Sequence, residues 1–287
     1  MQPDDFEICL GQRRVRGLRW NTGAPVPTLA LHGWLDNAGS FAAMAEYLQQ
    51  IKMQAIDLAG QGHSDPRGED GSYDLPGEMR DMHRIVTALS PDQPVNLLGH
   101  SRGAVICTLY AALFPQRVKR LMMIDAVEPF RSSLAELPES LAASIEQLES
   151  YGRRDASFYK TREEAIQARI NALTPVSRQG AEHLAHRALV ETDKGWCWQA
   201  DQRLKGTSGF RLTEEMRQLF YSRVKAPALL LEPLHGMMHK ESRFSGAGEF
   251  IPGLQRMPVP GGHHCHLDDC PQQVAQIAEK WFGEGKV

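Results

Sequence analysis

The stretch VNLLGHSRGAVI, residues 95–106, joins an apolar run of strand length to an apolar helical pattern. Between them lies Gly-x-Ser-x-Gly, the sequence of a nucleophile elbow, a strained turn that exposes a serine hydroxyl above the N-terminus of a helix. Side chains at Gly99 and Gly103 would collide with the neighbouring strand or helix. Because the five-residue pattern alone is common, the flanking strand and helix carry the prediction that Ser101 is a nucleophile.

The composition bounds the class of protein. A chain of 287 residues can form one large α/β domain, or a domain that carries an inserted module. The net charge of −3 and the absence of long like-charge blocks argue against nucleic-acid or anionic-membrane partners. Five scattered cysteines without a CxxC pair fit a reduced compartment. Without a secretory signal or an apolar run near the ~20 residues that span a bilayer, the sequence predicts a cytoplasmic protein with no membrane insertion.

Strand patterns alternate with helical ones along most of the chain. This alternation predicts an α/β fold with a doubly wound, mostly parallel sheet. The expected strands are 6–10, 14–20, 28–31, 53–58, 95–98, 118–124, 228–231 and 254–259, and the expected helices outside the middle block are 40–48, 79–89, the elbow helix and 271–282.

The middle of the chain differs. From Glu128 to Arg217 the strand-like runs vanish, and helical patterns cover 133–151, 161–173 and 179–190. We expect this block to be a helical insertion over the carboxyl edge of the strands, where such sheets bind their ligands. The predicted division is a core of residues 1–127 and 218–287 and an insertion of residues 128–217.

A serine hydroxyl needs a positioned base to become a good nucleophile. Residues 261–271, GGHHCHLDDCP, follow the last expected strand and offer His263, His264 and His266. Three histidines in one loop suit either a base or a metal site. Zinc sites draw further ligands from elsewhere, and no matching cluster stands out in the sequence. We therefore expect a loop base, with no metal and no cofactor.

Four motifs in this order resemble the α/β-hydrolase superfamily: HGW at 32–34, DxxGxGxS at 57–64, GxSxG at 99–103 and the terminal Gly-x-His…Pro segment. HGWLDN at 32–37, GWCWQAD at 195–201 and GGHHCHLD at 261–268 resemble its serine hydrolase-like subgroup. The resemblance runs from Phe6 to Phe282. It implies an α/β-hydrolase fold, with the middle block as a helical cap inserted after the sixth strand.

The resemblance also assigns the base. In the family the catalytic histidine usually lies seven residues before the proline of the last helix, which here is Pro271. That spacing favours His264, with His263 and His266 as alternates.

Two backbone N–H groups form the oxyanion hole in this family, and the matching residues are Trp34 and Arg102. The side chain at Arg102 is unusual beside a nucleophile. Two roles are open for it, binding a substrate carboxylate or pairing with a nearby acid, and the second is favoured.

The third member of the triad is harder to assign. Relatives usually carry an aspartate just after the strand expected at 228–231, and none occurs there. A minority place the acid at the end of the preceding core strand, which here is Asp125. Glu232 and Glu128 are the alternates. The acid would fix the tautomer of the histidine and stabilise its charged form.

Together these expectations describe a serine hydrolase that cleaves carboxylic esters through an acyl-enzyme on Ser101, with His264 as general base and Asp125 as acid. Its partner would be a small-molecule substrate, and no cofactor is implied. A carbon–carbon bond hydrolase would use the same triad. A non-catalytic ligand-binding protein on the same fold is the other alternative, because the usual aspartate is missing.

Overall fold

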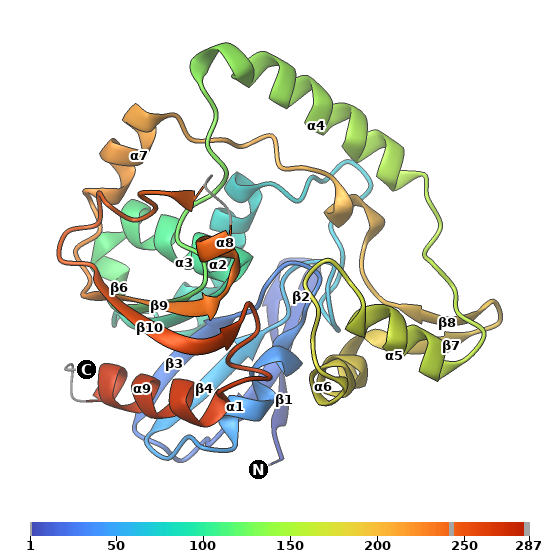
Figure 1. Ribbon diagram of the computed structural model, residues 1–287, viewed down its shortest axis with the longest axis horizontal. Helices are drawn as coiled ribbons and strands as arrows, with labels where there is room; N and C mark the ends of the chain where they lie inside the picture. The colour runs from blue at the N-terminus through green and yellow to red at the C-terminus, as the bar shows by residue number, and fades with distance from the viewer. Residues whose placement is uncertain (1, 241–243, 284–287) are drawn as a thin grey trace.

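The computed structural model describes residues 2–240 and 244–283. Its centre is an eight-stranded sheet in the order β1-β2-β4-β3-β5-β6-β9-β10 (Figure 1). β1 and β2 are antiparallel to each other, β2 is antiparallel to β4, and all other neighbours are parallel. The strands are β1 (Asp4–Leu10), β2 (Arg13–Trp20), β3 (Val26–Leu31), β4 (Ile51–Ile56), β5 (Val95–His100), β6 (Val118–Ile124), β9 (Ala228–His235) and β10 (Gln255–Gly262). The predicted α/β fold with a mostly parallel sheet is confirmed.

Helices cover both faces of the sheet, so the central strands are apolar on both sides. One face packs against α2 (Leu75–Leu89), α3 (Arg102–Leu113) and α7 (Glu214–Tyr221). The other packs against α1 (Ala42–Ala45) and α9 (Pro271–Gly283). Successive residues of a strand enter opposite layers: Leu97 and Leu230 lie in the first core, and Leu98 and Leu231 in the second.

The parallel strands bring their carboxyl ends to one edge. Gly99 pairs with Leu31, and Ile124 pairs with both His100 and Leu231. The loops that follow these strands therefore emerge side by side, which is where open α/β sheets bind ligands.

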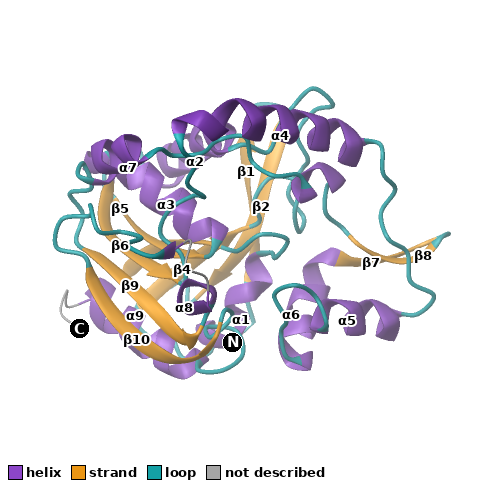
Figure 2. Cartoon of the chain, turned by 45° about the horizontal axis from the view of Figure 1, so that its top comes forward, coloured by secondary structure: helices purple, strands orange, loops and turns teal. Residues whose placement is uncertain are grey.

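The block between β6 and α7 contains α4 (Leu137–Gly152), α5 (Arg162–Ile170) and α6 (Arg178–Ala188). The prediction that it holds only helices is wrong, because β7 (Leu189–Thr192) and β8 (Gly195–Trp198) form an antiparallel hairpin. We refer to the block as the cap. In Figures 1 and 2, α4 stretches across the top of the molecule, and α5, α6 and the hairpin form a separate lobe.

The expected cap boundary at residue 217 cuts through α7, which packs against the core helix α3. Thr213 caps α7 by accepting the N–H of Met216. We propose that the cap ends before Thr213.

Two other elements differ from expectation at their ends. The helix expected at 40–48 is a short 3₁₀ turn followed by α1. α2 begins at Leu75 instead of 79, because Asp74 accepts the N–H of Gly77 and a proline occupies its first turn. The remaining short elements are η1 (Ala38–Phe41), η2 (Pro115–Arg117), η3 (Leu134–Glu136), η4 (Gln202–Lys205) and α8 (Met237–Lys240).

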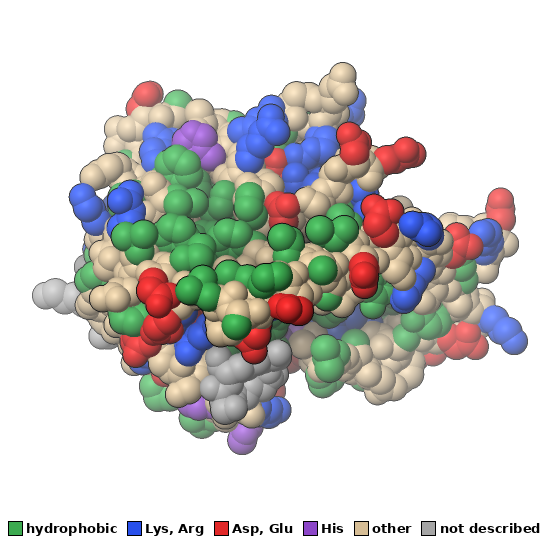
Figure 3. Space-filling view, turned by 90° about the horizontal axis from the view of Figure 1, so that it is seen from above, with side chains coloured by type: hydrophobic (Ala, Val, Ile, Leu, Met, Phe, Trp, Pro, Cys, Tyr) green, Lys and Arg blue, Asp and Glu red, His purple; other side chains and the backbone are tan. Residues whose placement is uncertain are grey.

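Buried ion pairs fasten the α5–α6 lobe to the core. Arg187 of α6 donates to Asp57 at 2.7 Å, and both side chains are at least 95% buried. Arg169 of α5 donates to Asp36 at 2.7 Å. In contrast, the side chains of Leu141 and Ile145 on α4 are more than half exposed. Figure 3 shows hydrophobic side chains gathered on the face of the molecule that is seen from above.

Within residues 2–240 and 244–283, no helix has both the length and the apolar character needed to cross a membrane.

Candidate active site

Ser101 sits at the junction of β5 and α3 with φ 51° and ψ −119°, a strained backbone conformation for a residue with a side chain. Its N–H donates to the carbonyl of Ile124 at 3.0 Å. A Cβ on Gly99 would lie 2.4 Å from Cα of Ala104, and a Cβ on Gly103 would lie 2.1 Å from the Leu31 carbonyl oxygen. Both glycines are therefore needed for this turn, as the sequence pattern predicted.

Asp125 follows β6, next to the elbow, and also has a positive φ of 51°. Its buried carboxylate accepts the N–H groups of Met237 at 2.6 Å and Met238 at 3.2 Å. It also accepts Nδ1–H of His263 at 2.7 Å. A Cβ on Gly236 would lie 2.4 Å from Oδ1 of Asp125. The loop after β9, which lacks the usual aspartate, thus wraps around a carboxylate supplied by β6.

His263 is the first residue after β10, and its side chain is 10% exposed. Its carbonyl accepts Nε2–H of His100 at 2.8 Å, and the centroids of the two rings are 4.6 Å apart. Because His100 directly precedes Ser101, this bond holds His263 beside the elbow. Nδ1 donates to Asp125, so Nε2 is the nitrogen with a lone pair.

His264, the base favoured by the family spacing, does not pair with Asp125 as the expected triad requires. Its Nε2 donates to Oδ2 of Asp36 at 3.1 Å, and its side chain is 2% exposed. Burial alone would raise the pKa of Asp36, but His264 and Arg169 more than offset this and hold it well below its ordinary value. The family spacing fails by one residue, because the loop from the paired histidine to Pro271 is one residue longer.

His266, the other alternate, is fully buried next to Phe41, and its Nε2 lies 2.9 Å from Oγ of Ser40. Burial lowers its pKa to about 3. The sequence analysis missed His100, whose burial, with the neighbouring histidines, lowers its pKa well below the ordinary value. Its position immediately before the nucleophile was the available signal.

The alternate acids are occupied by arginines. Glu232 accepts from Arg256 of the neighbouring strand at 2.7 Å. Glu128 accepts from Arg131 and Arg217, each at 2.9 Å. The histidine loop therefore meets Asp125 and not these two carboxylates.

The two expected oxyanion N–H groups lie at the same edge. Arg102 is the first residue of α3, so its N–H has no acceptor within the helix. Gly33 is followed by Trp34, Leu35 and Asp36. The N–H of Leu35 donates to the side chain of Gln61, and the N–H of Asp36 donates to the carbonyl of Gly33. Of the three N–H groups, the one of Trp34 is then left to bind an oxyanion.

The Arg102 guanidinium binds to α2 and to the segment before it. It donates to Oε1 of Glu78 at 3.1 Å and to the carbonyl of Tyr73 at 2.9 Å. Of the two roles left open by the sequence, the structure shows pairing with an acid.

A cavity of about 270 Å³ lies between the core and the cap. It adjoins the expected oxyanion residue, since the indole of Trp34 lines it and donates to the carbonyl of Leu204 in the cap at 2.6 Å. Trp198 also lines it and donates to the carbonyl of Ala165. The remaining lining includes Leu35, Asp36, Tyr159, Arg169, Leu173, Gln202 and Lys205.

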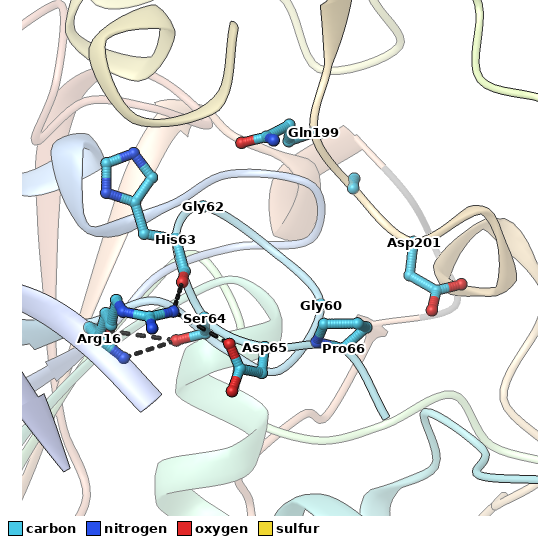
Figure 4. A pocket seen from close by; sticks show the side chains of 10 residues that line it. Arg16, Gly60, Gly62, His63, Ser64, Asp65, Pro66, Gln199 and Asp201 are labelled. Atoms are coloured by element: carbon cyan, nitrogen blue, oxygen red, sulfur yellow. Dashed lines mark hydrogen bonds and ion pairs between the residues drawn. The ribbon is translucent and has the colours of Figure 1, made fainter. Parts of the chain in front are cut away.

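A second pocket, of about 630 Å³, opens where the DxxGxGxS loop meets the cap (Figure 4). Arg16 donates to the His63 carbonyl and to Asp65 there, and Gln199 and Asp201 approach from the cap. The lining of neither pocket contains Ser101, Asp125 or His263, and the cavity of about 270 Å³ is the one that Trp34 lines. The motif behind the second pocket is structural, because the Asp57 carboxylate accepts the N–H groups of Ala38 and His63.

Comparisons with known proteins agree with this architecture. The family profile of the alpha/beta hydrolase fold matches residues 27–186. A serine hydrolase-like protein of Danio rerio is 26% identical over 95% of this chain and 86% of its own. The crystal structure of a hypothetical protein from Pseudomonas aeruginosa PAO1 is 33% identical, with a TM-score of 0.89 over 98% of this chain and 99% of its own. A thioesterase domain from the curacin biosynthetic pathway is 20% identical, with a TM-score of 0.84 over 96% and 99%, and shares the fold.

These matches confirm the resemblance that the four motifs indicated, including the serine hydrolase-like subgroup. The chain therefore belongs to the α/β-hydrolase fold family.

Proposed function

We propose that the chain is a serine hydrolase that cleaves carboxylic esters through an acyl-enzyme on Ser101. One observation carries the proposal: the Asp125–His263 pair, with its 2.7 Å bond, is held against the residue that precedes Ser101. Acyl transfer requires a nucleophile, an imidazole and a carboxylate. Here they would be Ser101, His263 and Asp125, which follow in the chain order Ser, Asp, His.

The roles follow from the hydrogen bonds. Asp125 accepts Nδ1–H of His263 and fixes the tautomer in which Nε2 is unprotonated. Nε2 takes the proton of Ser101 as the hydroxyl oxygen attacks the ester carbonyl, and returns it to the leaving alcohol. The N–H groups of Trp34 and Arg102 stabilise the oxyanion. Water, deprotonated by the same Nε2, then releases the acid and restores Ser101.

Asp125 is prepared for its role before substrate arrives. Two backbone N–H groups, from Met237 and Met238, hold its carboxylate in addition to His263. The acid therefore needs no rearrangement to stabilise the imidazolium that forms during the reaction.

The cavity beside Trp34 supports a small substrate. Its volume of about 270 Å³ is near the lower end of ligand pockets, which run from about 300 to 1,000 Å³. Cap residues such as Tyr159 and Trp198 form much of its wall. We therefore infer that the cap limits the acid or alcohol part of the ester, and that short-chain esters react fastest.

A fluorophosphonate probe tests the nucleophile. We expect the wild-type chain to be labelled and to hydrolyse p-nitrophenyl acetate, and the Ser101→Ala variant to do neither. Ser157→Ala, in the wall of the cavity, is the matched control and should still be labelled. A folded wild-type chain that takes up no probe would instead indicate the non-catalytic ligand-binding alternative.

A further inference from the structure

Three histidine rings surround one point beside the elbow. The centroid of His100 lies 4.6 Å from that of His263 and 5.0 Å from that of His264, and the last two are 5.0 Å apart. One nitrogen from each ring lies within 4.8 Å of the other two. His263 and His264 come from the terminal loop, whereas His100 comes from β5, so the sequence alone did not show this group.

Each ring is oriented by a bond at one nitrogen. His263 donates Nδ1–H to Asp125, His264 donates Nε2–H to Asp36, and His100 donates Nε2–H to the carbonyl of His263. Carboxylate and carbonyl oxygens only accept, so each donating nitrogen carries the proton. In a ring that carries one proton, the other nitrogen has a lone pair, which is Nε2 in His263 and Nδ1 in His264 and His100.

Two of these lone pairs lack a partner. Nδ1 of His100 and Nδ1 of His264 are buried and make no hydrogen bond within the described residues. A buried polar atom without a partner costs about 1–3 kcal/mol and calls for an explanation. Gly33 keeps the space beside His100 open, since a Cβ there would lie 2.9 Å from Nδ1 of His100.

We infer that His100, His263 and His264 form a binding site for one Zn²⁺ ion. Imidazole nitrogens are preferred zinc ligands, and ligating histidines usually donate their other N–H to a carboxylate or carbonyl, as all three do here. Two nitrogens bound to a tetrahedral zinc at about 2.0–2.1 Å are about 3.4 Å apart. One nitrogen from each of the three rings lies within 4.8 Å of the other two, so the nitrogens would have to move closer together to reach this spacing.

The ion would act as an inhibitor. It would bind Nε2 of His263, the nitrogen that takes the serine proton in the proposed function. The inhibition therefore rests on the proposed function. The site does not supply the zinc-bound water of a metallohydrolase in this scheme, because the proposed nucleophile is Ser101.

Titration calorimetry with ZnCl₂ on the chelator-treated full chain tests the site directly. We expect one Zn²⁺ per chain. His264→Gln and His100→Gln should each weaken binding by at least the ~10–100-fold that loss of an outer partner costs. The matched control is His186→Gln, an exposed histidine on α6, which should bind as the wild type does. Circular dichroism checks that each variant is folded. Absence of binding, or equal binding by the trio variants, would overturn the inference.

Hydrolysis of p-nitrophenyl acetate separates the two proposals. If both hold, Zn²⁺ inhibits with a midpoint that matches its affinity, and EDTA restores the rate. A zinc-binding chain that hydrolyses no ester without zinc would refute the proposed function and keep the site. A chain that hydrolyses esters equally well with zinc bound would refute the inhibitory role and keep the proposed function.

Discussion

Two aspartate–histidine pairs lie next to each other in this protein, and they differ in what else holds them. Asp125–His263 is held by backbone N–H groups of the core loop after β9. Asp36–His264 is held by Arg169 of the cap. In the first pair, backbone donors fix the carboxylate, and the imidazole has a free nitrogen near the elbow. The second is part of a buried ion-pair network between core and cap. Neighbouring histidines thus differ in role through their partners.

The largest effect should appear when each of the two histidines is replaced by glutamine in a separate variant. We expect His263→Gln to lower kcat for p-nitrophenyl acetate by about 10⁴–10⁶-fold, since the serine loses its base. His264→Gln should lower it far less, because its Nε2 is bound to Asp36. A larger loss at residue 264 than at 263 would reverse the assignment of the pairs.

The two carboxylates should separate turnover from stability. Asp125→Asn should reduce kcat by about 10⁴-fold, because the amide favours the wrong histidine tautomer. Asp36→Asn should mainly lower the free energy of unfolding, by about 3 kcal/mol, since the charge of the buried Arg169 loses its partner. Urea unfolding and steady-state rates, measured on both variants, provide the comparison. The proposed difference between the two carboxylates is wrong if Asp125→Asn hydrolyses the ester at the wild-type rate.

The backbone support of Asp125 can be tested without touching either pair. Gly236→Ala places a Cβ against the Asp125 carboxylate, and a displacement near 1 Å can cost about 10²-fold in rate. Gly23→Ala, where a Cβ meets nothing within 4 Å, is the control and should be fully active. Equal rates for both variants would show that the exact position of Asp125 does not matter.

A smaller effect is expected from pH, with His32 as a reference histidine that pairs with no carboxylate. Its Nδ1 donates to the Gly33 carbonyl and its Nε2 accepts the N–H of Leu58. Burial lowers its pKa below 6.5, so it is neutral when folded but protonates more readily when unfolded. Stability should therefore be intact above pH 6.5 and fall below it, with this residue contributing at most about 1.4 kcal/mol per pH unit.

The measurement is the urea midpoint of the wild type and of His32→Gln at pH 7.5 and 5.5. The variant should lose less stability between these values, because one titrating group is removed. The exposed His186→Gln should behave like the wild type. Parallel pH slopes for His32→Gln and wild type would contradict the assignment.

Periodicity was sufficient to predict the sheet, because strands buried on both faces read as continuous apolar runs such as Leu229–Leu231. The hairpin of β7 and β8 was missed. Its strands have four residues each and are only partly buried, so they show no strand pattern. The elbow was predictable because Gly99, Ser101 and Gly103 lie within five consecutive residues, between a strand pattern and a helical pattern. The contact that excludes a side chain at Gly103 is with the distant Leu31, which the sequence does not show.

The choice of histidine could not be predicted by counting. It depends on where β10 ends and on its irregular pairing with β9 between Val259 and Gly262. A shift of one residue moves a side chain to a different face. Asp125 was proposed as the acid because the family resemblance allows an acid at the end of the strand before the cap. The backbone donors of Met237 and Met238 that hold its carboxylate depend on tertiary contacts, which the sequence does not show.

The bond between Arg187 and Asp57 sets a condition for exchanging caps between relatives. Asp57 has no exposed surface, and its carboxylate also receives the N–H groups of two core loops. A transplanted cap without an arginine at this place would leave the buried charge of Asp57 without its cationic partner, at a cost of about 3–5 kcal/mol. A chimera designed for a new substrate must therefore bring this arginine along, or remove Asp57 and rebuild the loop that it organises.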